Sequence, residues 1–321
     1  MGSVIGRLFA LTPSLYAGDF TGVWRAAGQV IEGVNPYRTH TEHLPYPLGP
    51  LAYPLTAAIA ALPLATLSAW LSAALFVGLS ITALAYSLLG GPPFRLLAFG
   101  TPCFVMAMSV VQWSPLLTAA AVIPPLGIFV SCKPNLGLAL FARRPSWWIV
   151  GGSAALVAVS LALIPTWPIE WLRNIRGMTY YKAPIAMPGG ALLLLALLRW
   201  RDEDARMLFV LSMVPSNLFM YDQLPLFLIA RSRRDMLLLF AGSWLVPVVG
   251  HFTVPEWVAD EIAQQTYMRA PTVAFLFLPA LYIILSRPSA SARPDIVDRI
   301  LNRRLAMTRH RRATQTKRTG V

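Results

Sequence analysis

The acidic residue Asp19 stands at the start of a long polar stretch in an otherwise apolar chain. It belongs to the run GDFTGVWRAAGQVIEG, and an Asp before an amphipathic sequence that ends in Gly is typical of a helix N-cap. A carboxylate at the edge of an apolar surface has another use, because burial raises the pKa of an acid and makes it a better proton acceptor. Both interpretations stay open, since a capping Asp can also act as a base.

Three more polar residues interrupt apolar sequence further along the chain. Lys133, in SCKPNLGLALF, is a charge flanked by apolar runs. Such a charge either serves a function or extends its ammonium group to a lipid headgroup. Tyr221 and Asp222, in PSNLFMYDQLPLF, lie between two apolar halves. They form either a solvated turn or a polar cluster that faces a cavity.

Arg173, Arg176 and Lys182 gather positive charge in one polar stretch between apolar segments. Basic groups at a membrane surface can bind the phosphate or pyrophosphate of a lipid. They can equally form a surface patch on anionic lipids. The sequence alone leaves both interpretations open.

The composition indicates an integral membrane protein. Hydrophobic residues occupy 56% of the 321 positions and charged residues only 13%, against about 25% in soluble domains. So little polar surface cannot cover a globule in water. The two cysteines, Cys103 and Cys132, lie in apolar segments and the four histidines are scattered, so no metal site and no cofactor are expected.

The net charge of +13 indicates membrane topology rather than nucleic-acid binding. Ten of the 27 Lys and Arg residues lie in 287–321, which we interpret as a basic, disordered cytoplasmic tail that contacts anionic lipid. Most of the other basic residues form short clusters between apolar segments, and short Arg-rich loops stay on the cytoplasmic side. This assignment places the C-terminus in the cytoplasm and the Asp19 loop outside the cell membrane.

The apolar segments predict an all-α, polytopic protein, with a transmembrane domain over 1–286. The outer loop, 18–67, is expected to carry interfacial helices, and 165–188 and 251–270 are expected to be loops. Several segments are short or broken by proline, and such breaks persist at membrane depth only where they are buried or line a cavity. The nine or ten segments include 4–17, 68–89, 94–111, 114–141, 147–164, 190–200, 207–230, 236–250 and 271–286.

Four short motifs in a fixed order carry a family resemblance. The pattern GDF…W.AA….EG.NPY……YP…P precedes QWSPLL, KPNLGLALFARRPSWW and PSNLFMYDQLPLFLI, from Gly18 to about Ile229. In this order the motifs resemble the polyprenyl-phosphate-sugar-dependent glycosyltransferases of the GT-C superfamily. The closest group is glycosyltransferase family 87, the polyprenol-phosphate-mannose-dependent α-mannosyltransferases. In that family a complete transmembrane helix precedes the GDF loop, and here only 17 residues do. The expected YPP is YPLGP, so we expect an N-terminally truncated member, a reduced member or a member that has lost its activity.

The resemblance implies a GT-C-like bundle with hexosyltransferase activity. Asp19 would deprotonate an acceptor hydroxyl, which attacks the anomeric carbon of a polyprenyl-phosphate sugar with inversion. The expected sugar is mannose, and the acceptor is a glycolipid or polysaccharide on the outer face of the plasma membrane. The phosphate leaving group needs cationic or dipolar stabilisation. The candidate substrate-binding residues are Arg173, Arg176, Lys182, Lys133, Tyr221 and Asp222.

Two other classes of function remain compatible with the sequence. A flippase or transporter of lipid-linked sugars suits broken helices and buried polar turns equally well, and it would need Lys133 and Asp222 at the membrane midplane. A non-catalytic membrane subunit would agree with the short segment before Asp19.

Overall fold

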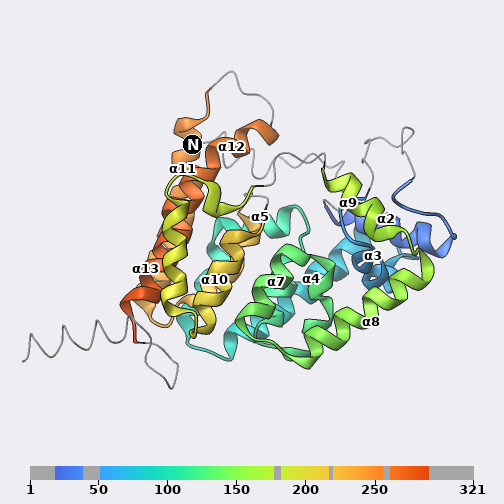
Figure 1. Ribbon diagram of the computed structural model, residues 1–321, viewed down its shortest axis with the longest axis horizontal. Coiled ribbons are helices and arrows are strands. Elements are labelled where there is room, and N and C mark those ends of the chain that lie inside the picture. The colour runs from blue at the N-terminus through green and yellow to red at the C-terminus, as the bar shows by residue number, and fades with distance from the viewer. Residues whose placement is uncertain (1–18, 39–50, 177–181, 217–219, 256–260, 289–321) are drawn as a thin grey trace, which may run out of the picture.

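The computed structural model describes residues 19–38, 51–176, 182–216, 220–255 and 261–288 (Figure 1). Their secondary structure is helical, apart from an isolated antiparallel bridge between Lys182 and Ser216, so the predicted all-α class is confirmed. The α-helices are α2 (Phe20–Ile31), α3 (Leu55–Ala61), α4 (Ala69–Leu89), α5 (Pro102–Ser109), α6 (Ser114–Ala120), α7 (Pro134–Arg143), α8 (Trp147–Leu163), α9 (Trp167–Arg176), α10 (Glu203–Met213), α11 (Arg233–Thr253), α12 (Glu261–Thr272) and α13 (Leu278–Ser286). The tighter 3-10 helices are η1 (Leu62–Leu64), η2 (Pro93–Gly100), η3 (Pro124–Cys132), η4 (Pro184–Ala186), η5 (Gly190–Arg199) and η6 (Tyr221–Ile229), and η7 (Val273–Phe277) is a π-helix.

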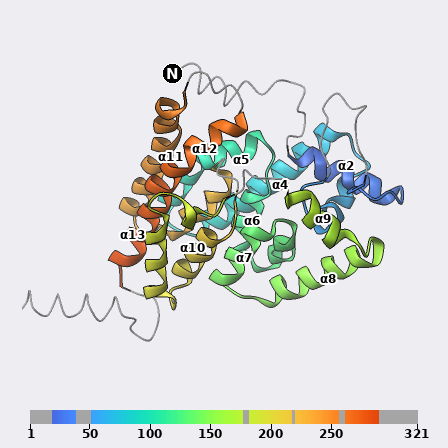
Figure 2. The ribbon, with the colours of Figure 1, turned by 45° about the horizontal axis from the view of Figure 1, so that its top comes forward.

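The helices form two groups joined by a central layer of short helices. Helices α10, α11 and α13 stand together on one side, and α2, α8 and α9 lie on the other, with α5 and α7 between them (Figures 1 and 2). In the central layer α6 packs against α4, η3, α7 and η6, and α7 packs against α10.

Within the described residues, three helices are long and apolar enough to cross a membrane: Ala69–Leu89, Arg233–Thr253 and Tyr267–Ser286. Helices α8 and α9 would supply a fourth span if they count as one, although they are bent by 98°. Large apolar side chains are exposed on these elements, among them Leu79 at 65% and Trp147 at 86%. A lipid environment would cover such surfaces, and this supports a membrane protein.

Proline explains why the middle of the chain forms short helices. The predicted segment 114–141 is split into α6, η3 and α7, with Pro124 at the start of η3 and Pro134 at the start of α7. Proline lacks an N–H donor and clashes with the preceding turn, so it begins a helix far more readily than it continues one. It also restricts the residue before it, and Lys133 accordingly leaves the helical region at φ −142° and ψ 82°.

Two stretches expected to be loops contain helices. Residues 165–188 include α9, whose sequence WPIEWLRNIR buries Trp167 and exposes Ile169 and Leu172, and residues 251–270 include most of α12. The sequence of α9 has the amphipathic periodicity of a helix, but its charged residues led to the prediction of a loop. Helix α3 is not the interfacial helix that was expected in the outer loop 18–67, because almost all of it is buried between α2, η3 and α8.

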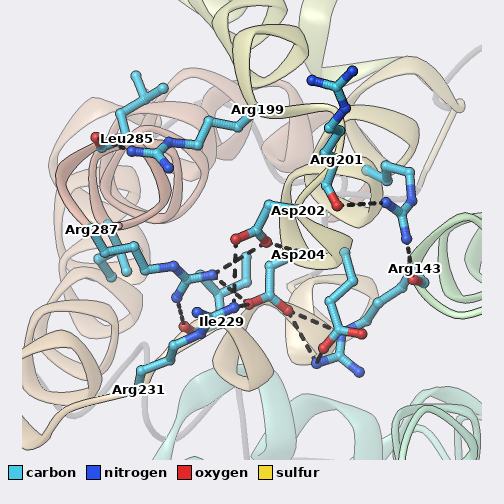
Figure 3. Close-up of polar contacts among 12 residues, drawn as sticks. Arg143, Arg199, Arg201, Asp202, Asp204, Ile229, Arg231, Leu285 and Arg287 are labelled. Carbon is cyan, nitrogen blue, oxygen red and sulfur yellow. Dashed lines mark hydrogen bonds and ion pairs between the residues drawn. The ribbon is translucent and has the colours of Figure 1, made fainter. Parts of the chain in front are cut away.

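A buried ion-pair cluster ties the ends of four elements together (Figure 3). Asp204, at the start of α10, pairs with Arg143 at the end of α7, Arg231 after η6, and Arg287 after α13. The neighbouring Asp202 pairs with Arg231 at 3.5 Å and Arg287 at 3.6 Å. Both carboxylates are about 1% exposed, so each depends on these partners for the hydration it has lost. We call these five residues the arginine cluster.

The arginine cluster predicts a stability difference between two adjacent acids. Asp204→Asn removes the buried negative charge that pairs with Arg143, Arg231 and Arg287. Breaking such a network costs roughly 3–5 kcal/mol. Glu203→Gln removes only a 3.3 Å contact to Arg143 from a side chain that is 40% exposed, and exposed pairs contribute about 0–1 kcal/mol. Thermal unfolding in detergent should show a marked fall for Asp204→Asn and almost none for Glu203→Gln. Equal unfolding temperatures for the two variants would contradict a stabilising role for the arginine cluster.

Candidate functional site

Asp19 occupies the N-cap position of α2, but its side chain does not cap the helix. Its backbone is helical, at φ −65° and ψ −20°, and within the described structure the carboxylate makes no capping hydrogen bond. Instead Oδ2 accepts a hydrogen bond from Nε2 of Gln112. The predicted helix begins where expected and ends at Ile31, two residues before Gly33 with φ +74°, but the carboxylate is bonded to a residue 93 positions away.

Gln112 connects Asp19 to a buried ion pair. Its Oε1 accepts from Nζ of Lys133 at 2.8 Å and from the hydroxyl of Tyr53 at 3.0 Å. Nζ of Lys133 lies 2.5 Å from Oδ1 of Asp222, whose other oxygen accepts from Asn135 at 3.2 Å. We call this chain of side chains the Asp19 network: Asp19, Gln112, Lys133, Asp222, Tyr53 and Asn135.

The charge of Lys133 is compensated inside the protein. Lys133 is 8% exposed and Asp222 1%, so the ammonium group does not extend to a lipid headgroup. The face of the Tyr221 ring provides another contact, with Nζ 4.5 Å from its centroid. The structure therefore argues against a headgroup contact for Lys133 and against a solvated turn at Tyr221 and Asp222, because all three side chains are buried.

An aromatic stack holds the two backbones that carry Asp19 and Gln112. Phe20 stacks on Phe76 of α4 with centroids 4.5 Å apart, and Trp113 meets the same ring edge-on at 4.8 Å. The backbone N–H of Asp19 also donates to the carbonyl of Val110 at 2.9 Å. The residues that directly follow Asp19 and Gln112 thus pack on one ring, which fixes their relative position.

Two strained residues lie immediately before residues of the site. Val111 has φ +53° and precedes Gln112, and Met220 has φ +68° and precedes Tyr221 and Asp222. A β-branched residue is a rare outlier at positive φ, and the left-handed conformation costs roughly 1–2 kcal/mol. Such strain persists only where the surroundings enforce it, and it concentrates at functional sites. Both turns that orient the network are therefore held by packing rather than by local preference.

The electrostatic balance at Asp19 favours a proton acceptor. Desolvation by the surrounding protein raises the pKa of its carboxyl above the ordinary value, while the Lys133 charge and the Gln112 hydrogen bond oppose that rise and Asp222 adds to it. Asp19 nevertheless keeps exposed surface. Asp19 therefore combines desolvation by the surrounding protein with exposed surface, so a solute can reach this residue.

The candidates Arg173, Arg176 and Lys182 lie apart from this network. Arg173 and Arg176 are exposed on the last turn of α9, and Lys182 is exposed where its backbone bridges to Ser216. Within the described residues no hydrogen bond or ion pair joins them to the Asp19 network. Helix α9 is nevertheless anchored beside the network, because Nε1 of Trp171 donates 2.9 Å to the carbonyl of Ala52, next to Tyr53.

The NPYR segment is anchored by the same helix. Glu170 of α9 accepts from Asn35 at 2.8 Å and pairs with Arg38 at 2.6 Å. The hydroxyl of Tyr37 donates to the carbonyl of Tyr53 at 2.9 Å. This motif positions the Tyr53 segment that reaches Gln112.

The sequence did not identify Gln112, Tyr53 or Asn135 as site residues. Gln112 had a usable signal, because an amide between apolar residues and directly before Trp-Ser-Pro must find buried partners. Asn135 directly follows Pro134 at the start of α7, and Tyr53 directly precedes Pro54. Among the described residues no group of three or more His, Cys, Asp or Glu side chains could hold a metal ion.

No protein-family description, curated protein or solved structure matches this chain.

The aromatic stack predicts how firmly the site is held. Phe76→Ala removes the ring on which Phe20 and Trp113 pack, and truncating a buried Phe costs about 3–5 kcal/mol. Leu79→Ala on the same helix is the matched control, because that side chain is 65% exposed. Thermal unfolding in detergent should separate the two variants clearly. A loss for Phe76→Ala no larger than for Leu79→Ala would show that the stack is not structural.

Proposed function

We propose that this protein is a membrane glycosyltransferase of GT-C type, which moves a sugar from a polyprenyl phosphate to a hydroxyl acceptor. The observation that carries the proposal is the state of Asp19. Its carboxylate leaves the helix uncapped, is held through one oxygen by Gln112, and remains accessible. A carboxylate used only as a helix cap would instead bond to the N–H groups of its own helix.

In the proposed reaction Asp19 takes the proton of the acceptor hydroxyl as that oxygen attacks the anomeric carbon. The bond from this carbon to the phosphate oxygen breaks, and the polyprenyl phosphate leaves with the electron pair. Attack from the face opposite the phosphate inverts the configuration. The raised pKa of the Asp19 carboxyl supports a base role, because a more basic carboxylate accepts a proton more readily.

The charges of the Asp19 network indicate that the acceptor hydroxyl and the lipid phosphate bind in different regions of the protein. With Asp19 ionised, the two carboxylates of Asp19 and Asp222 outnumber the single ammonium of Lys133. This centre therefore suits the hydroxyl groups of an acceptor better than a phosphate. We assign the lipid phosphate to the exposed basic residues Arg173, Arg176 and Lys182, and we assign support of the centre to Lys133, Tyr221 and Asp222.

We place the Asp19 site on the outer side and the arginine cluster on the cytoplasmic side. Helix α7 joins Lys133 to Arg143 over ten residues, or about 15 Å. With the arginine cluster at the cytoplasmic boundary, the Lys133 end of the Asp19 network would lie recessed near the middle of a hydrocarbon core about 30 Å thick. A recessed site suits a donor that is itself a membrane lipid, with mannose the sugar implied by the family resemblance.

The same depth favours a second candidate, a transporter of lipid-linked sugars, because an ion pair near the membrane midplane is typical of such proteins. Depth alone does not separate the two functions, since Asp19 and the Lys133–Asp222 pair belong to one network. Only the glycosyltransferase forms a new glycosidic bond. Net transfer of sugar is therefore the property that distinguishes them.

The test uses membranes that contain the protein, a radiolabelled polyprenyl-phosphate mannose and a mixed glycolipid acceptor fraction. Wild type should transfer label to the acceptor. Asp19→Asn should reduce the rate about 100-fold or more, because general-base catalysis contributes roughly 10²–10⁴-fold.

Glu32→Gln is the control for charge loss, since Glu32 is an exposed carboxylate at the other end of α2. It should transfer label at the wild-type rate. Transfer by Asp19→Asn within twofold of wild type would overturn the base assignment. Label that crosses the bilayer without joining the acceptor would favour the transporter.

A further inference from the structure

The orientation of the Gln112 side chain is fixed by its neighbours. Lys133 and Tyr53 both approach Oε1, at 2.8 Å and 3.0 Å. The ammonium of Lys133 is only a donor, so a flipped amide would place an NH₂ group against it. Nε2 must therefore face Asp19, and its N–H donates to Oδ2 of that residue.

This orientation gives the two oxygens of Asp19 different roles. Oδ2 receives the N–H of Gln112, whereas no side-chain hydrogen bond engages Oδ1 within the described residues. A hydrogen bond to a charged acceptor stabilises the ionised form of that acceptor. The donor is itself polarised, because the Lys133 charge pulls on the opposite end of the same amide.

We propose that Gln112 is a positioning residue that carries the influence of Lys133 to Oδ2 of Asp19, keeps the carboxylate ionised and leaves Oδ1 to accept the proton. The assignment of Oδ1 rests on the proposed function; the control of the ionisation of Asp19 does not. Tyr53 acts on Asp19 through Gln112, and Lys133 acts both through Gln112 and by the direct attraction of its charge.

The geometry has little freedom to rearrange. Val111, with φ +53°, fixes the turn before Gln112, and Trp113 after it packs on Phe76. Gln112 is 1% exposed, so water cannot readily replace its partners. A substitution that removes the amide therefore removes the hydrogen bond rather than exchanging it for another.

Few charged groups compete with this control. Among the described residues, Lys133 and Asp222 are the charged groups that act on Asp19, in opposite directions. Helices α3 and α4 and the short η1 pack on α2, and their sequences contain no Asp, Glu, Lys, Arg or His, with Tyr86 of α4 the one titratable side chain. Helix α2 itself contributes Arg25, and α6 after Gln112 has no charged residue. Loss of Gln112 removes one of the two interactions that lower the pKa of Asp19, so desolvation should raise that pKa further.

The experiment measures the protonation of Asp19 directly. Dicyclohexylcarbodiimide modifies protonated carboxyl groups in apolar surroundings, and mass spectrometry of the Asp19 peptide gives the modified fraction at each pH. The exposed Glu32 falls on the other side of Arg25 after trypsin cleavage and provides the reference for reagent reactivity in the same sample. The full-length protein in nanodiscs is used throughout.

In Gln112→Met the midpoint of Asp19 labelling should rise by about one to two pH units above wild type, as expected for the loss of one hydrogen bond to a charged acceptor. Tyr53→Phe, which keeps the ring and removes one donor to Oε1, should raise the midpoint by a smaller amount. If Gln112→Met does not fold, Tyr53→Phe alone decides. An unchanged midpoint in a folded variant would overturn the proposal.

Transfer activity provides a separate readout. The acid limb of the kcat/KM profile should move upward together with the labelling midpoint in Gln112→Met. A labelling shift in a protein without transfer activity would support the control of Asp19 and count against the proposed function. Transfer activity with no labelling shift would overturn the role of Gln112 and leave the proposed function standing.

Discussion

The buried charge of Lys133 is the constraint on which the rest of the site depends. An ammonium group that is 8% exposed in an apolar helical protein is costly unless oppositely charged and hydrogen-bonding groups surround it. Asp222 provides the charge, Gln112 the carbonyl oxygen and Tyr221 the aromatic face. Because Lys133 and these partners lie in three separate stretches of sequence, satisfying Lys133 brings those stretches together, and Gln112 extends the arrangement to Asp19.

Short helices connect this site to the arginine cluster. Helix α7 begins after Lys133 and ends at Arg143, and η6 begins at Tyr221 and ends two residues before Arg231. Two buried ionic clusters therefore hold both ends of the same pair of helices. The positive N-terminal ends of these helices face the site with the excess carboxylate, and Arg143 lies at the negative end of α7, as the helix dipole favours. These two helices hold the Asp19 network at a fixed distance from the arginine cluster.

The sequence predicted the helical class, the start of α2 at Asp19 and the splitting of 114–141 by proline. These features depend on local rules of capping, hydropathy and backbone geometry, which act over a few residues. The partners of Asp19 could not be predicted in the same way. The Asp19 N-cap and the Gln112 turn are 93 residues apart, and tertiary contacts bring them together, namely the packing on Phe76 and the backbone hydrogen bond from Asp19 to Val110. Helix α9 was mistaken for a loop because Glu170, Arg173 and Arg176 gave it a polar composition, while Trp167 and Trp171 carried its buried contacts.

A double-mutant cycle on Lys133 and Asp222 tests the central role of the buried charge most directly. Lys133→Met and Asp222→Leu should each lower the thermal unfolding temperature of the protein in detergent strongly, because each leaves the other charge buried without its partner. The double variant should recover much of that loss, with a coupling energy of about 2 kcal/mol or more. If the two losses simply add, Lys133 and Asp222 do not depend on each other, and the buried charge is not what organises this site.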